Sequence, residues 1–228
     1  MLYPEKVYLL RGNHEWQGVS LSTSEGSFVD HIKERYPKEW DYVTDMFFKV
    51  FSYLSLAAIV DKRIFCVHGG IPRVFASDRL VNIMDHIEFL AKPLRDEGFP
   101  LFLSPYIVFD LVWSDPVSSE RERPAPGILP PGFCTSRRDR DGSIRACTFE
   151  KEVLTQFLAE YKLEMIVRAH QCVSTGSIVV NNRQMITLFS SSGYDGRNNA
   201  GVLLVYNNKI HFLKMQFNRY TGRLQSYV

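Results

Sequence analysis

The chain has 228 residues, of which 45% are hydrophobic and 23% charged, and this is enough apolar material for the core of one large domain or two small ones. The formal net charge of +2 argues against a general electrostatic binder of nucleic acid or of a membrane surface. No apolar run approaches the roughly 20 residues that a membrane-spanning helix requires.

The four cysteines indicate a reducing environment. Cys66, Cys134, Cys147 and Cys172 show neither Cys-x-x-Cys pairs nor the spacing of a zinc finger. In a chain of this length they are typical of reduced, mostly buried thiols. The amino-terminal residues also lack the apolar stretch of a secretory signal. We therefore expect a cytoplasmic and/or nuclear protein.

The first third of the chain predicts a strand, two helices and a hairpin. Residues 7–10, Val-Tyr-Leu-Leu, form an apolar run typical of a strand. Residues 25–36 and 38–51 have helical spacing, with a proline between them. Two apolar runs at 53–60 and 64–67, joined by Asp-Lys-Arg, predict a β-hairpin.

The amino-acid composition changes in the middle of the chain. Residues 78–90 predict a helix, and residues 109–113 form a short apolar run. Residues 116–143 are crowded with proline, glycine and charged side chains. We expect an exposed loop excursion there, within a single domain that spans residues 1–228, because such composition favours turns and irregular structure.

The last part of the chain alternates a helix and strands. Residues 149–163 predict an amphipathic helix, and residues 164–167 predict a strand. Residues 177–189 and 201–215 each contain two apolar runs joined by Asn-Asn. Asparagine tolerates the positive φ of tight hairpin turns, so both segments predict β-hairpins.

Three predicted strands end close to a histidine. His14, His68 and His170 follow the runs Val-Tyr-Leu-Leu, Ile-Phe-Cys-Val and Glu-Met-Ile-Val. A lone histidine at a strand end is more often structural than functional. Three in the same setting, with Asn13 beside the first, offer neutral nitrogen and oxygen donors suited to manganese, iron or zinc. The pattern indicates a metal site at one edge of a sheet.

Five motifs together carry a family resemblance. They are Arg-Gly-Asn-His-Glu at 11–15, His-Gly-Gly at 68–70, Trp-Ser-Asp-Pro at 113–116, Arg-Ala-His at 168–170, and Ser-Ser-Ser-Gly-Tyr at 190–194. In this order the chain resembles the phosphoprotein phosphatase family of serine/threonine protein phosphatases, within the calcineurin-like metallophosphoesterase superfamily. The resemblance implies an α/β fold, a β-sandwich flanked by helices in four layers, with two divalent metal ions at strand ends.

The resemblance also implies roles for individual residues. Asn13, His68 and His170 correspond to the ligands of one metal ion, and His14 to the general acid that protonates the leaving serine or threonine oxygen. Asn13, Arg145 and Tyr194 correspond to groups that bind the substrate. A metal-activated water would attack phosphorus, and an arginine fork suits phosphate oxygens.

Two motifs of the family are not found in the sequence. They are Gly-Asp-x-His-Gly and Gly-Asp-x-x-Asp-Arg-Gly, which supply the other metal ligands, and the pairs at 30–31, 85–86 and 139–140 do not replace them. We therefore expect a fold incomplete on its amino-terminal side, with at most one partial metal site and weak or no activity in this chain alone. Exposed sheet edges would then favour a regulatory subunit or a second copy as partner.

Three functions stay open on the sequence. The first is a protein phosphatase acting on phosphoserine and phosphothreonine. The second is a catalytically inactive regulatory or phosphoprotein-binding module, and the third is a phosphoesterase for small phosphates such as dinucleoside polyphosphates. The Trp-Ser-Asp-Pro motif and Glu15 favour the first over the third, and the retained His14 favours it over the second. We expect neither nucleic acid nor a membrane as partner.

Overall fold

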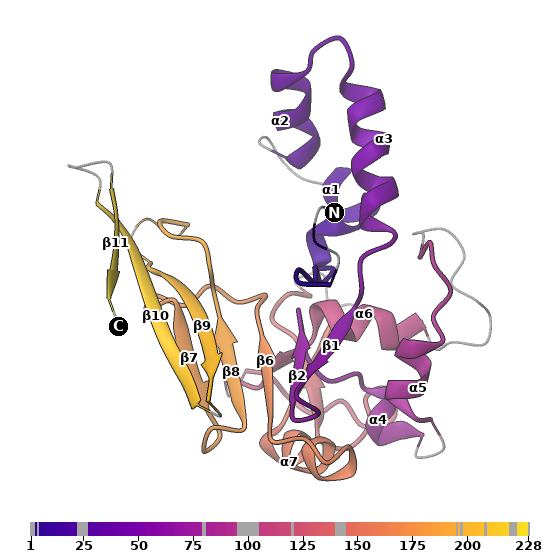
Figure 1. Ribbon diagram of the computed structural model, residues 1–228. Helices are drawn as coiled ribbons and strands as arrows, with labels where there is room; N and C mark the ends of the chain where they lie inside the picture. The colour runs from indigo at the N-terminus through magenta and orange to yellow at the C-terminus, as the bar shows by residue number, and fades with distance from the viewer. Residues whose placement is uncertain are drawn as a thin grey trace.

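The structure is a computed structural model. It describes residues 3, 5–21, 27–78, 81–94, 105–119, 121–139, 145–194, 196, 198–207, 209–218 and 223–227, and side chains within these except those of 105, 216–218 and 223–227. Three sheets and a set of short helices make up this part of the chain (Figure 1).

A mixed five-stranded sheet forms the centre. Its strands are β1 (Ala57–Val60), β2 (Ile64–Val67), β6 (Met165–Arg168), β8 (Met185–Leu188) and β7 (Ser177–Val180), in that order across the sheet. The pairs β2–β6 and β6–β8 are parallel, whereas β1–β2 and β7–β8 are antiparallel hairpins. The two hairpins predicted at 53–67 and 177–189 are confirmed by these pairs, and the third, predicted at 201–215, by the antiparallel pairing of residues 200–206 with 209–215. Parallel pairing places the carboxyl ends of β2 and β6 at the same edge.

A second sheet is an antiparallel meander. It comprises β9 (Ala200–Tyr206), β10 (Lys209–Asn218) and β11 (Arg223–Tyr227), in the order β11-β10-β9. Strand β9 lies against β7 and β8, so the second sheet continues beside the first (Figure 1). Gly176 permits this approach, because a Cβ there would lie 2.6 Å from the carbonyl carbon of Ala200 and its φ is +80°.

A third, small sheet lies beside the carboxyl end of β6, where Arg168 donates to Asp115. Its strands are β3 (Asp115–Pro116), β5 (Cys147–Phe149) and β4 (Phe133–Thr135), with β3 parallel and β4 antiparallel to β5. Strand β4 belongs to the segment 116–143, for which we expected exposure. In fact Leu129, Phe133 and Cys134 are buried, because β4 pairs with β5 and its side chains join the core.

Helices cover the sheets and extend beyond them. They are the 3-10 helix η1 (Asn13–Glu15) and the α-helices α1 (Gln17–Leu21), α2 (Phe28–Arg35), α3 (Trp40–Phe51), α4 (Val74–Ser77), α5 (Ile83–Glu88), α6 (Pro105–Trp113) and α7 (Lys151–Glu160). Helices α2 and α3 form a hairpin that projects away from the sheets (Figure 1). Phe28 packs against Phe47 and Phe51 between them, at ring-centroid distances of 5.1 and 5.8 Å.

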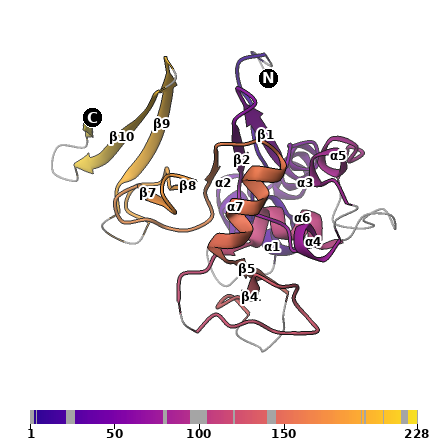
Figure 2. The same cartoon turned by 90° about the horizontal axis from the view of Figure 1, so that it is seen from below.

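The core lies between α7, α6 and the strands. Helix α7 follows the predicted amphipathic pattern, and its Phe157 packs on Phe65 of β2 with 5.4 Å between ring centroids. Figure 2 shows α7 beside β2 and α4 from below. The short apolar run at 109–113 is the end of α6, where Leu111 is fully buried. A short apolar run of this kind is compatible with a buried strand or a buried helix, and periodicity alone does not distinguish them.

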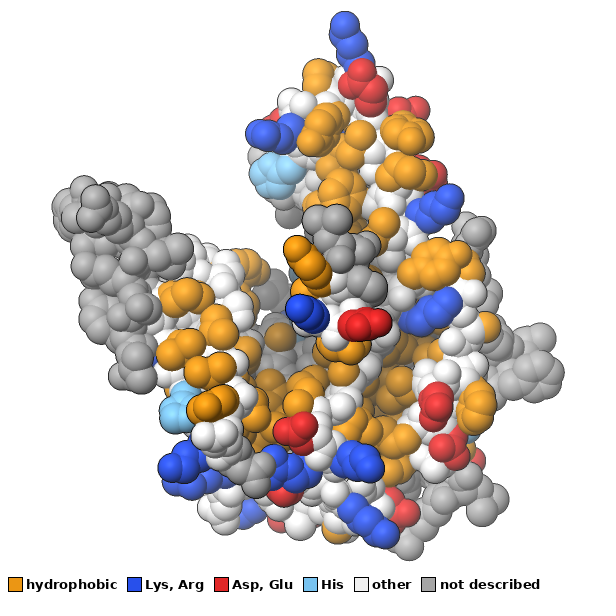
Figure 3. Space-filling view, in the orientation of Figure 1, with side chains coloured by type: hydrophobic (Ala, Val, Ile, Leu, Met, Phe, Trp, Pro, Cys, Tyr) orange, Lys and Arg blue, Asp and Glu red, His pale blue; other side chains and the backbone are white. Residues whose placement is uncertain are grey.

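The predicted first strand is not formed. Of residues 7–10, only Leu10 pairs, through a single parallel bridge to Ser55, while Val7, Tyr8 and Leu9 are exposed. In the described part of the chain this segment has no neighbouring strand along its length. Exposed apolar side chains also gather over α3 and over the β9–β10 hairpin (Figure 3). No helix in the described residues has the length and apolar character needed to cross a bilayer.

Candidate active site

Two histidines meet at the carboxyl edge of the central sheet. His68 follows the last residue of β2, and His170 comes two residues after β6. Because β2 and β6 are parallel neighbours, the two imidazoles lie together, with 5.0 Å between their ring centroids. This edge is where ligands commonly bind in α/β sheets.

Helix η1 brings a third donor to the same place. The Arg11 amide donates to the Ser55 carbonyl at 2.8 Å, which ties the chain before η1 to the start of the hairpin. Asn13, only 3% exposed, places its Oδ1 2.8 Å from Nε2 of His68. The Glu15 carboxylate turns back and accepts from the Gly12 amide at 2.8 Å, which caps this short helix.

Electrostatics keep both imidazoles neutral. Burial, helped by the positive charge of Arg168, lowers the pKa of His68 from 6.5 to about 4. Burial, together with the charges of Arg138 and Arg168, lowers the pKa of His170 to about 2. At neutral pH each ring therefore has a lone pair available for a ligand.

The donor set fits one divalent cation incompletely. Nε2 of His170 is buried and has no hydrogen-bond partner among the described residues, and His170 adopts a left-handed backbone with φ +63°. A buried nitrogen without a hydrogen-bond partner costs free energy unless a ligand pairs with it. A left-handed backbone at a residue other than glycine also costs free energy and is common at functional sites. Asn13 Oδ1 and Nε2 of His68 lie beside it as further donors. Within the described ranges no three His, Cys, Asp or Glu side chains form a metal-binding group. The donors named here are two unprotonated imidazoles and an amide oxygen, so this set carries no charge.

A tryptophan and a glycine hold the His170 side of this edge. The indole of Trp113 meets the His170 ring edge-on at 5.4 Å and stacks on Phe109 at 5.9 Å. A Cβ on Gly69 would lie 2.7 Å from the backbone of Val112 and Trp113. Glycine after His68 is therefore required for α6 to approach the sheet.

The donors open into a cleft of about 720 Å³. Five of the six residues predicted from the sequence line it, namely Asn13, His14, His68, His170 and Tyr194. His14 is exposed at this cleft. Tyr194 is 72% exposed and meets Phe189 edge-to-face at 5.3 Å, so this aromatic pair forms the rim.

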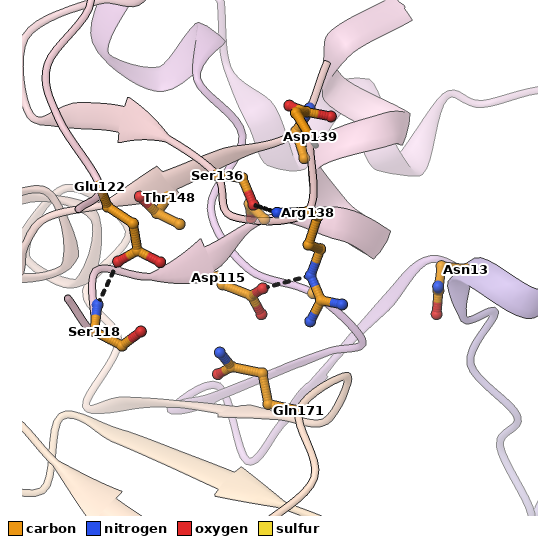
Figure 4. A network of polar contacts seen from close by, with 12 residues as sticks. Asn13, Asp115, Ser118, Glu122, Ser136, Arg138, Asp139, Thr148 and Gln171 are labelled. Carbon is orange, nitrogen blue, oxygen red and sulfur yellow. Dashed lines mark hydrogen bonds and ion pairs between the residues drawn. The ribbon is translucent and has the colours of Figure 1, made fainter. Parts of the chain in front are cut away.

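The structure places the predicted phosphate arginine, Arg145, elsewhere. Arg145 is not among the residues that line the cleft, and its backbone carbonyl accepts a hydrogen bond from the Arg73 guanidinium. Arg138 lines the cleft instead, and its Nε donates to Asp115 Oδ2 at 2.8 Å. Figure 4 shows the Arg138 side chain between Asp115 and Asn13.

Sequence reasoning missed Arg138 because it lies in the segment interpreted as a surface loop. The available signal was the Arg-Arg pair at 137–138, which closely follows a short apolar run. What places Arg138 is the pairing of β4 with β5 and the buried carboxylate of Asp115, and neither is a local property of the sequence.

A larger hollow lies away from these histidines. It has a volume of about 1220 Å³ and runs between α4 and α7, with Glu150, Glu152 and Glu160 among its lining residues. No histidine, lysine or arginine is among the described residues that line it. Size alone therefore does not identify the reactive site, and we assign that role to the smaller cleft.

Comparisons with known proteins agree with this geometry. The profile of the calcineurin-like phosphoesterase family matches residues 1–174. A solved protein serine/threonine phosphatase from Saccharomyces cerevisiae, described as similar to human phosphatase PP5, superposes with a TM-score of 0.67 at 21% identity. A point mutant of a cold-active protein tyrosine phosphatase superposes with a TM-score of 0.54 at 14% identity.

The matched portions differ in extent. The alignments cover 99% and 96% of this chain, but 61% of the yeast phosphatase and 58% of the tyrosine phosphatase. The chain thus spans about three-fifths of the length of either structure. At these identities the likeness is one of fold: a mixed α/β arrangement of sheets flanked by helices, as the sequence predicts.

Proposed function

The chain belongs to the calcineurin-like phosphoesterase family, and from that premise we propose that it acts as a divalent-metal-dependent phosphatase on phosphoserine and phosphothreonine in proteins. The observation that carries the proposal is the convergence of Asn13, His68, His170, His14 and Arg138 on one cleft. Donors for a cation, a proton donor and a cationic fork are the three groups that phosphomonoester hydrolysis needs.

The neutral donors would hold the metal. Asn13 Oδ1, His68 Nε2 and His170 Nε2 are the atoms available, and the low pKa values of the two histidines keep protons from competing. A bound divalent cation supplies Lewis acidity and lowers the pKa of its water. Three neutral donors bind weakly compared with sets that include carboxylates. We therefore propose that this chain alone binds one cation weakly and turns over slowly.

The remaining cleft residues would act on the phosphate ester. Arg138 presents its terminal nitrogens to the phosphate oxygens, since its Nε is already engaged by Asp115. His14, exposed at the mouth, donates a proton to the departing serine or threonine oxygen. Phe189 and Tyr194 contact the peptide on either side of the phosphorylated residue.

The exposed apolar surface supports a partner. Val202, Leu204 and Tyr206 on β9 and Tyr42 and Val50 on α3 are each at least 36% exposed. Apolar patches of this kind mark protein contacts. We propose that a regulatory subunit or a second copy of the chain covers them, in addition to the phosphoprotein substrate.

A manganese-supplemented assay on a phosphoserine peptide tests the proposal. His14→Asn should lower turnover by about 10²-fold or more, because a general acid contributes on that scale. Metal content should not change, because the described donors exclude His14. His31→Asn is the matched control, since His31 lies on α2 and its side chain is 69% exposed. It should leave turnover essentially unchanged.

The outcomes separate the alternative functions. Loss of metal in His14→Asn would show that His14 is a ligand and not the acid. Metal and phosphopeptide binding without turnover would favour the regulatory module. Faster turnover of a dinucleoside polyphosphate or a phosphotyrosine peptide than of the phosphoserine peptide would contradict the proposed substrate class.

A further inference from the structure

A buried carboxylate joins two arginines behind the cleft. Asp115, the third residue of the Trp-Ser-Asp-Pro motif, is 5% exposed. Its Oδ1 accepts from Arg168 Nη2 at 2.6 Å. Its Oδ2 accepts from Arg138 Nε at 2.8 Å, the contact marked in Figure 4. Each carboxylate oxygen is thus committed to a different guanidinium, so the three side chains are mechanically linked.

Arg168 is the buried partner of Asp115, and several hydrogen bonds hold it in place. It is 1% exposed, and its Nε donates to the Gly69 carbonyl just past His68. Its Nη1 donates to Gln171 Oε1 at 2.6 Å, just past His170. One buried guanidinium therefore connects the two histidine-bearing loops. Movement of Asp115 is restricted because its Arg168 partner is held on several sides.

Arg138 is the partly exposed partner of Asp115. Its side chain is 33% exposed, and its only side-chain partner in the described residues is Asp115. Among the described residues no side chain other than Asp115 holds the Arg138 guanidinium, so within this part of the chain its orientation depends on the contact at Nε. Without the contact, Arg138 would populate several rotamers, and binding an anion would then have to reorder it.

We propose that Asp115 is a positioning residue for phosphate binding: it holds the Arg138 guanidinium in the cleft and couples it, through Arg168, to the loops that carry His68 and His170. This inference rests on the proposed function, because it takes Arg138 as the group that binds phosphate. It also assigns a task to the 116–143 segment, which delivers a cationic side chain to the cleft. Asp115 itself touches neither substrate nor metal.

Phosphate affinity measured by isothermal titration on the manganese-loaded protein tests this role. Asp115→Asn should weaken binding of inorganic phosphate about tenfold, the scale of losing one oriented charge-assisted contact, with manganese affinity unchanged. Glu122→Gln is the matched control: Glu122 is a buried carboxylate of the same region, and its Oε2 accepts from the backbone amides of Ser118 and Ser119. It should leave phosphate affinity unchanged.

A double-mutant cycle separates positioning from a general structural effect. Arg138→Gln should fold, because Arg138 is partly exposed, and it should weaken phosphate binding by itself. If Asp115 acts through Arg138, then adding Asp115→Asn to Arg138→Gln changes phosphate affinity less than about twofold. Additive losses would overturn the proposal, because they would show that Asp115 acts independently of Arg138.

A second measurement does not depend on phosphate. In the wild-type protein the Nε–H of Arg138 should give a nuclear magnetic resonance signal protected from solvent exchange, and Arg138→Lys, which identifies that signal, also removes it. Asp115→Asn should abolish the protection, and it keeps an oxygen acceptor for the buried Arg168. Protection that survives this change overturns the proposal. A wild-type protein with a protected signal but no phosphate affinity would instead refute the proposed function.

Discussion

The buried ion pair between Arg73 and Asp110 anchors the loop that carries His68. Arg73 donates to Asp110 from its backbone amide at 2.8 Å, from Nε at 2.8 Å and from Nη2 at 2.7 Å. Asp110, on α6, is 0% exposed, and Arg73 is 6% exposed. Burial alone would lower the pKa of Arg73, but the hydrogen bonds and charge of Asp110 outweigh burial and raise it.

Replacing Asp110 with alanine should be severely destabilising. Asp110→Ala removes the acceptor of three hydrogen bonds and leaves the Arg73 cation buried. Breaking a buried pair in this way costs about 3–5 kcal/mol of the free energy of unfolding. For a chain of this size a loss of about 1 kcal/mol moves the melting temperature by about 2–4 °C, so we expect a fall of roughly 6–20 °C.

Urea unfolding followed by circular dichroism measures the loss. Asp45→Ala is the control, because Asp45 is an exposed residue of α3, and it should change stability by less than about 0.5 kcal/mol. The double variant Arg73→Met/Asp110→Leu should regain much of the loss, since no charge is then left unpaired. A loss below about 1 kcal/mol in Asp110→Ala, or a double variant as unstable as the summed single variants, would refute the reasoning.

Three further outcomes follow from the cleft and the thiols. Titration with manganese should quench the fluorescence emission of Trp113, whose indole lies against His170. In His170→Ala the manganese concentration needed for half of that quenching should rise at least about tenfold. An unchanged concentration would place the metal elsewhere. The metal-free protein should be most stable above about pH 6.5 and should lose stability toward pH 4. The reason is that the unfolded chain binds protons at His68 and His170 at their ordinary pKa, whereas the folded chain does not. Denaturant titrations that give the same free energy of unfolding at about pH 7.5 and 4.5 would contradict this. Iodoacetamide at about pH 8 should modify the exposed Cys172 first, because burial and the charge of Glu150 raise the pKa of Cys134 to about 11; peptide mass spectrometry gives the order.

Local patterns were sufficient for most of the secondary structure. The turn residues of the Asn-Asn hairpins show why: Asn181 and Asn182 have φ of +50° and +51°, and Asn207 has φ of +48°. Asparagine adopts this conformation more readily than other non-glycine residues, so the sequence signal has a direct steric cause. The apolar spacing of α7 predicts its buried face, including Val153 and Phe157, for an equally local reason.

The errors arose where tertiary neighbours decide. Residues 7–9 have the composition of a strand, but a strand requires hydrogen bonds from a neighbour, and only Leu10 has one. Local patterns assign no element to the apolar run at 109–113 for a related reason: Leu111 and Val112 belong to a helix that is apolar on most sides, for which helical periodicity is weak.

The candidate site likewise contains residues that local sequence patterns indicate and one residue that they do not. His68 and His170 could be found because each closely follows a recognisable strand, and family motifs place Asn13 and His14 beside them. Arg138 could not, because its position depends on an ion pair with a residue 23 positions earlier in the chain.

The hydrogen bond from Arg168 to Gly69 spans 99 positions of sequence, and this separation bears on the order of folding. The β1–β2 and β7–β8 hairpins close over a few residues, but β2 and β6 must find each other across nearly half the chain. Contacts of that range close slowly, because the entropy of a long loop is lost before they form. Cation affinity should therefore emerge only in the last kinetic phase, after most of the circular dichroism signal has returned.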